Sequence, residues 1–108
     1  MNVLFDHSTP APLASHLTGH QVTKAKDRGW DRLENGDLLT EGERAGFELL
    51  VTADNNMGYQ QYLTGRRIAI VVLSTPQWPR VRYHVVRVAA IVSNATPGSY
   101  TEVEIPYE

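Results

Sequence analysis

The chain has no cysteine, and none of its apolar runs approaches the length of about 20 residues that a membrane-spanning helix needs. The first absence excludes disulfides and thiolate-bound metals. The second predicts a protein without a transmembrane segment. Because the first residues lack the basic start and the long apolar stretch of a secretion signal, we expect a cytoplasmic protein.

Neither sign of charge dominates the 108 residues, whose formal net charge is −2. The charges are nevertheless unevenly distributed. Residues 1–54 hold nine acids and five bases, whereas residues 55–101 hold five arginines and no acid. An acidic half beside a basic half is compatible with a cation site next to a track for a polyanion. For any single arginine, solvated surface charge is an equally good interpretation.

Length and periodicity predict one domain over residues 1–108, built from alternating strands and helices. The expected strands cover residues 2–5, 20–23, 47–52, 67–73 and 99–105. The expected helices cover residues 10–18, 35–45, 56–63 and 79–92. The strand at 67–73 is so continuously apolar that both of its faces should be covered. This order predicts a three-layer α/β/α fold with a mainly parallel sheet of four or five strands.

The expected helix at 35–45 has the clearest ends. Its Leu38, Leu39 and Ala45 should face the core. Gly42 should weaken it by roughly 1 kcal/mol relative to alanine, and Gly46 should end it.

Aspartates follow two of the expected strands at their carboxyl ends. Asp6 ends the first strand and Asp54 lies just past the third. Functional crevices of open parallel sheets lie beyond these ends, and Asp37, in the first turn of the preceding helix, should point to the same edge. Three converging carboxylates need a hard cation, so the pattern predicts Mg²⁺ or Mn²⁺ acting on a phosphodiester. The alternative interpretation is that Asp6 and Asp37 cap helices.

Four short motifs connect the chain to a known family. They are N-G-D-L-L at residues 35–39, T-A-D-N-N at 52–56, Y-Q-Q at 59–61 and L-T-G-R-R at 63–67. Together they resemble the small bacterial PIN-like proteins, a family often described as of unknown function and sometimes grouped with toxin ribonucleases. The similarity extends from the first strand to about Pro79.

The resemblance implies a ribonuclease whose acidic residues hold one or two Mg²⁺ or Mn²⁺ ions. Asp6 matches the first-strand aspartate of the family, and Asp54 matches the aspartate of the T-x-D motif, with the Thr52 hydroxyl as its buttress. Asp37 falls where PIN domains place a helix acid. The resemblance thus makes Asp6, Asp37 and Asp54 both metal ligands and catalytic residues. Many relatives read D-E-N at the first strand, whereas His7 and Ser8 follow Asp6 in this chain, so one familiar acid is missing.

Other polar residues are expected to hold these ligands in place or to contact substrate. They are His7, Asn35, Thr52, Asn56, Gln60, Gln61, Arg66 and Arg67. His7 is a candidate ligand or general acid, or simply a polar loop residue. The two arginines are candidate partners of phosphates.

The sequence therefore predicts a Mg²⁺- or Mn²⁺-dependent endoribonuclease that acts on RNA, as the toxin of a toxin–antitoxin pair. An antitoxin protein is then the expected partner, and a homodimer the expected assembly. The alternative is a catalytically weak or inactive PIN-like module that binds RNA or a partner protein. The missing acid after Asp6 and the modest net charge favour this alternative. A third possibility is a structural protein that dimerises through its last helix.

Overall fold

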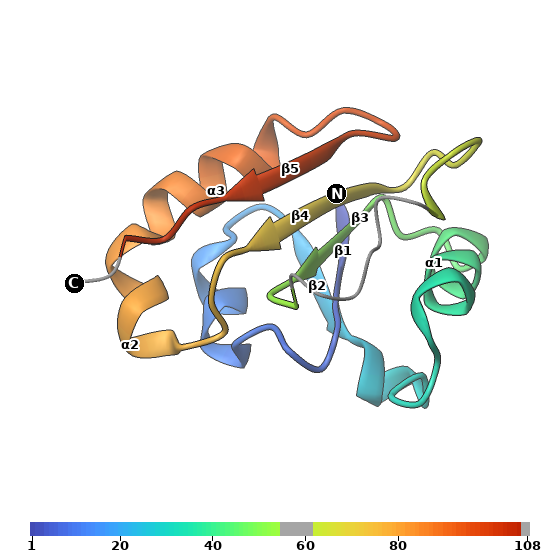
Figure 1. Cartoon of the computed structure of the whole chain (residues 1–108), viewed down its shortest axis with the longest axis horizontal. Helices are drawn as coiled ribbons and strands as arrows, with labels where there is room; N and C mark the ends of the chain where they lie inside the picture. Colours follow the sequence, from blue (N-terminus) through green and yellow to red (C-terminus); the bar gives the residue numbers. More distant parts are fainter. Residues whose placement is uncertain (55–61, 107–108) are drawn as a thin grey trace.

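A five-stranded parallel sheet organises the protein (Figure 1). The computed structural model describes residues 1–54 and 62–106. The strands are β1 (Asn2–Phe5), β2 (Gln21–Lys24), β3 (Leu49–Thr52), β4 (Ala69–Leu73) and β5 (Tyr100–Val103). Their order across the sheet is β2-β1-β3-β4-β5. The predicted α/β class and parallel sheet are confirmed, as is the neighbouring position of the first and third strands.

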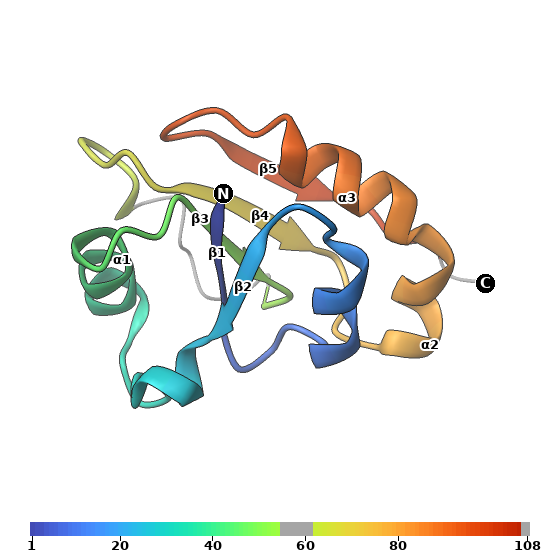
Figure 2. The same cartoon turned by 180° about the vertical axis from the view of Figure 1, so that it is seen from behind.

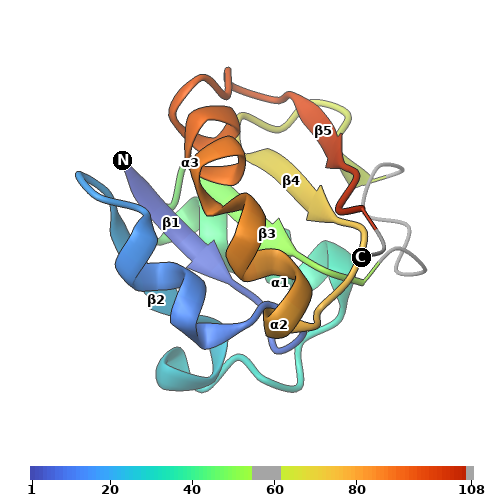
Figure 3. The same ribbon diagram turned by 90° about the vertical axis from the view of Figure 1, so that its left-hand side faces the viewer.

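Helical elements cover both faces of the sheet and complete three layers (Figure 3). On one face lie the α-helix α1 (Asn35–Arg44) and the 3-10 helix η2 (Ala25–Arg28). The other face carries the 3-10 helices η1 (Ala11–His16) and η4 (Arg82–His84) with the α-helices α2 (Trp78–Val81) and α3 (Val85–Ser93). Here η1 and α3 lie side by side (Figure 2). No helix in the described ranges is long and apolar enough to cross a membrane.

The strand side chains alternate between two cores, as the pleat of a sheet requires. One core contains Val3, Phe5, Leu49, Val51, Val71 and Leu73, covered by Leu13, Leu17, Val88 and Val92. The other contains Leu4, Leu50, Ile70 and Val72, covered by Leu38 and Leu39. All residues of β3 and β4 are buried. This burial confirms that the continuous apolar run of β4 is covered on both faces.

The helix α1 ends in a Schellman motif, as the predicted stop at Gly46 requires. Gly46 has φ +94°; its N–H donates to the Glu43 carbonyl at 3.1 Å, and the Phe47 N–H donates to the Gly42 carbonyl at 2.9 Å. Ala45 was expected in the core but is exposed, because it is the cap residue, with ψ −2°, at which the chain leaves the helix. Gly42 faces the sheet instead. A Cβ there would lie 3.1 Å from Leu4 Cδ2, so close packing as well as helix propensity bears on this position.

Three other expected elements differ from the sequence prediction. The predicted first helix is the short 3-10 helix η1, in which the Leu13 N–H donates to the Pro10 carbonyl at 3.1 Å and the Leu17 N–H donates to the Ala14 carbonyl at 3.2 Å. The single helix expected at 79–92 is divided into α2, η4 and α3. The helical turn expected at 56–63 lies almost entirely on residues 55–61, outside the described residues.

The strand order places a topological switch point between β1 and β3. The chain leaves β1 for β2 on one side and later enters β3 on the other side. In open sheets of the order 2-1-3-4-5, ligands bind in the crevice beyond the carboxyl ends of the strands at this point. Phe5 pairs with Val51, so the next positions in register are Asp6 and Thr52, at the switch point itself.

Candidate functional site at the carboxyl edge

Asp6 is a buried carboxylate at the end of β1, with 4% of its surface exposed. Its Oδ2 accepts a hydrogen bond from the Thr52 hydroxyl at 2.5 Å. The sequence prediction assigned this hydroxyl to Asp54, whereas here it donates to Asp6 and accepts a hydrogen bond from the backbone N–H of Asp54 at 3.2 Å. Strand register explains the difference, because Thr52 lies opposite Asp6 in the neighbouring strand.

The second oxygen of Asp6 is held by the turn that follows β1. Its Oδ1 accepts hydrogen bonds from the Ser8 N–H at 3.0 Å and the Ser8 hydroxyl at 2.7 Å. Thr9 Oγ1 lies 3.1 Å from the same oxygen and 2.6 Å from the Val51 carbonyl. Because a hydroxyl carries one hydrogen, the shorter contact to the carbonyl is the one Thr9 donates to.

Two hydroxyls connect the backbone after β3 to the Asp6 carboxylate. The Ala53 N–H donates to Ser8 Oγ at 2.9 Å, and Ser8 in turn donates to Asp6. Thr52 forms the parallel connection from Asp54. We call Asp6, Ser8, Thr9 and Thr52, with these two N–H groups, the Asp6 network. Hydrogen bonds to a carboxylate are stronger than neutral ones, so the network joins the ends of β1 and β3.

Among the described residues, Asp37 makes no hydrogen bond to this network. It is exposed in the first turn of α1 and lines a separate hollow with Glu34, Asn35, Gly36 and Tyr62. Within residues 1–54 and 62–106, no three His, Asp or Glu side chains are close enough to hold a metal ion together. The described residues therefore do not assemble the expected site of Asp6, Asp37 and Asp54.

The fit to Mg²⁺ or Mn²⁺ can be judged from the donor atoms. The Asp6 network offers oxygen atoms, the ligands such ions prefer. Both oxygens of Asp6 already accept hydrogen bonds, which a cation would have to displace. The metal therefore stays a prediction. Asn56, Gln60 and Gln61, expected to support it, lie outside the described residues.

Arg66 and Arg67 lie at the opposite edge of the sheet. They precede β4, which runs parallel to β1 and β3, so they sit at its amino end. The Arg66 guanidinium donates to the Tyr62 carbonyl at 2.7 Å and lies 3.6 Å from Glu43. They precede a strand whereas Asp54 follows one, so the arginines and Asp54 lie at opposite edges of the sheet. Their contact with phosphates stays a prediction.

A pocket of about 180 Å³ opens beside Asp6 and brings together side chains that the sequence analysis did not connect. It is lined by Asp6, His7, Thr9, Ala11, Lys24, Ala25 and Lys26. Lys24 ends β2 and pairs in register with Phe5, directly before Asp6. The sequence contained a signal for this, because Lys24 is the last residue of β2 and Asp6 directly follows β1. Parallel neighbouring strands bring such residues to the same edge. His7 is exposed at this pocket, as an expected substrate contact would be.

Electrostatically the pocket combines one buried carboxylate with two ammonium groups. Lys24 is half-buried and Lys26 is exposed. Among the described residues, neither lysine lies within ion-pair distance of a carboxylate. Both ammonium groups are therefore available to an anion that enters the pocket.

Comparisons of the chain with protein-family models, curated proteins and solved structures find no match. The resemblance to PIN-like proteins remains a prediction from the motifs, and the function has to be argued from the site.

Proposed function

We propose that this chain binds RNA through the carboxyl edge of its sheet, with the phosphate backbone against Lys24, Lys26 and His7. The observation that carries this proposal is the pocket that these side chains share with Asp6 at the ends of β1 and β2. Lysines contact phosphates as point charges and supply affinity without reading sequence. The motifs shared with PIN-like proteins favour RNA as the polyanion.

Binding of a labelled single-stranded RNA, followed by fluorescence anisotropy at several salt concentrations, tests this proposal. Replacing Lys24 and Lys26 together by alanine should weaken binding by about tenfold or more. It should also reduce the slope of log K against log salt by about 1.4, because each of the two phosphate contacts on a single strand contributes roughly 0.7.

The matched control removes two positive charges from the other face of the sheet. These are Arg82 on η4 and Arg87 on α3, which lie in the acid-free part of the sequence. They test whether RNA binds to the arginines of that part instead of the lysine pocket. Their double alanine variant should keep both the affinity and the salt slope nearly unchanged. A larger loss in this control than in the lysine variant would refute binding at the lysine pocket, because Arg87 donates to the Glu104 carbonyl beside β5, at the far side of the sheet from β2.

A second candidate function is metal-dependent cleavage of the bound RNA, as the sequence predicts. The observation that favours it is the delivery of Asp6 and Asp54 by neighbouring strands to the edge that also carries the lysine pocket. An RNA phosphate held by the lysines would lie next to these carboxylates. Asp54 is half-buried, and Asp54→Asn keeps the backbone N–H that donates to Thr52.

Cleavage is tested with the wild type and Asp54→Asn in Mn²⁺ or Mg²⁺, with a chelator as the blank. If the candidate holds, the wild type cuts RNA only with the ion, and Asp54→Asn binds RNA normally without cutting it. Equal cutting by both proteins would identify a contaminating nuclease, and no cutting by either would leave RNA binding as the function.

The cytoplasmic location, the homodimer, the toxin role and the antitoxin partner stay predictions. Growth arrest by the wild type alone would support the last two.

A further inference from the structure

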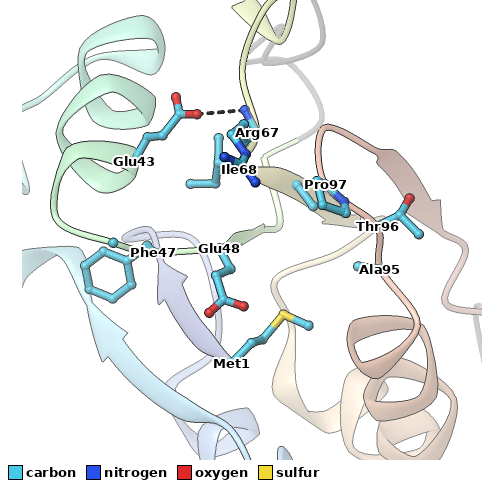
Figure 4. Close-up of a pocket in the computed structure, with 11 residues that line it drawn as sticks. Met1, Glu43, Phe47, Glu48, Arg67, Ile68, Ala95, Thr96 and Pro97 are labelled. Atoms are coloured by element: carbon cyan, nitrogen blue, oxygen red, sulfur yellow. Dashed lines mark hydrogen bonds between the residues drawn. The ribbon is translucent and has the colours of Figure 1, made fainter.

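A further hollow, which we call the second hollow, lies at the amino edge of the sheet, away from the proposed RNA site (Figure 4). It has a volume of about 350 Å³ and opens where β3 and β4 begin, beside the turn before β5. Its main lining residues are Met1, Phe47, Glu48, Arg67, Ile68 and Pro97. This volume is near the lower limit of ligand pockets in proteins, so a ligand held there would be small.

Hydrogen bonds fix the walls of this hollow. The Schellman motif at Gly46 directs the chain from α1 into Phe47 and Glu48. Glu43, also at the hollow, accepts a hydrogen bond from the backbone N–H of Arg67 at 2.7 Å. The Arg67 carbonyl accepts one from the Gly98 N–H at 2.9 Å, which attaches the turn at 96–98. The pocket is therefore formed before any ligand arrives.

Two side chains of opposite charge line the pocket without pairing. Among the described residues, neither the Glu48 carboxylate nor the Arg67 guanidinium makes a hydrogen bond or an ion pair. In Figure 4 the Glu48 side chain extends toward Met1, whereas that of Arg67 lies by Ile68 and Pro97. The accessible apolar part of the lining includes Met1, which is half-buried, and Pro97, which is exposed. The pocket thus offers an anion position, a cation position and an apolar wall.

We propose that this pocket binds a free amino acid with an apolar side chain. Its carboxylate would accept the paired N–H donors of Arg67, and its ammonium group would face Glu48. The side chain would pack on Met1 and Pro97. An anion alone would meet the carboxylates of Glu43 and Glu48, and a cation alone would meet Arg67, so a ligand with both charges suits the pocket best. The site is independent of the RNA proposal, because it lies at the other edge of the sheet.

L-leucine and L-phenylalanine are the probes, added to ¹⁵N-labelled protein and followed by NMR. Saturable shifts are expected at residues 46–48, 67–69 and 95–97 with a Kd on the order of 1 mM. Glu48→Gln and Arg67→Gln should each weaken binding by about tenfold, the loss of one charged contact. Glu104→Gln makes the same replacement beyond the carboxyl end of β5 and should change nothing.

Singly charged analogues separate the two charge contacts. N-acetyl-L-leucine lacks the ammonium group, so it should bind about tenfold more weakly and lose nothing further in Glu48→Gln. L-leucinamide lacks the carboxylate and should behave in the same way toward Arg67→Gln. The proposal is overturned if neither amino acid gives saturable shifts in the wild type, or if both analogues bind as tightly as leucine.

Discussion

A buried aspartate needs partners for its charge, and Asp6 finds them in hydroxyl groups. Its oxygens accept hydrogen bonds from Ser8 and Thr52, which also accept from the backbone beyond β3. Buried polar groups are stabilising only when they are satisfied. The Asp6 network therefore has a structural task, joining β1 to β3, whatever else this edge does.

This task predicts a measurable energy at the residue scale. Asp6→Asn replaces one acceptor oxygen by an NH₂ group that faces hydroxyl hydrogens, so the free energy of unfolding in urea should fall by about 2 kcal/mol. Asp37→Asn changes an exposed carboxylate in the same way and should stay within about 0.5 kcal/mol of the wild type.

A double-mutant cycle with Thr52→Val then isolates the contact between Asp6 and Thr52. We expect a coupling energy of about 1 kcal/mol or more, whereas Asp6→Asn combined with Thr101→Val on β5 should be additive. Additivity in both cycles would show that the Asp6–Thr52 hydrogen bond contributes nothing to stability.

The individual residues also show the reach of sequence reasoning. Strand patterns were enough to place Asp6 and Asp54 at neighbouring strand ends. The partner of Thr52 depends on the register between β1 and β3, which the pattern of a single strand does not contain. The position of Lys24 beside Asp6 depends on the pairing of β2 with β1, which the sequence pattern of β2 does not contain.

At the scale of elements, the turn from α1 into β3 depends on the backbone of Gly46. Its φ of +94° is a conformation that side chains with a Cβ rarely adopt. Gly46→Ala should lower the free energy of unfolding by about 1–2 kcal/mol, although a Cβ there would meet no atom within 4 Å. Gly46→Asn should cost less, because asparagine tolerates left-handed backbone. Equal stability of Gly46→Ala and the wild type would contradict this account.

The edge strand β5 carries Tyr100, a phenol whose titration bears on stability. Burial, followed by the neighbouring Glu102 carboxylate, raises the pKa of Tyr100 above its ordinary value. The folded protein therefore holds this proton more tightly than the unfolded chain. The resulting stability is fully present below the unfolded pKa of about 10 and is lost as pH rises through the folded pKa.

Urea titrations between neutral and strongly alkaline pH test this dependence. Tyr100→Phe should remove part of the loss of stability above about pH 10. A profile that is identical in the wild type and Tyr100→Phe would show that the phenol is not involved.

At the scale of the molecule, the parallel sheet separates two kinds of site. Its carboxyl edge carries the Asp6 network and the lysine pocket, and its amino edge carries Arg66, Arg67 and the second hollow. The apolar pattern predicted the class and the three layers, because burial on both faces leaves a continuous apolar run. It did not predict the pockets at the two edges, because these depend on side chains from elements that are far apart in the sequence.

We propose that RNA contacts the carboxyl edge of the sheet. An NMR titration of the wild-type protein with short single-stranded RNA locates this contact directly. The largest amide shifts are expected at residues 6–9 and 24–26, with residues 46–48 and 80–87 nearly unchanged. Shifts concentrated at 80–87 on the arginine-bearing helices, with 6–9 and 24–26 unmoved, would contradict the claim.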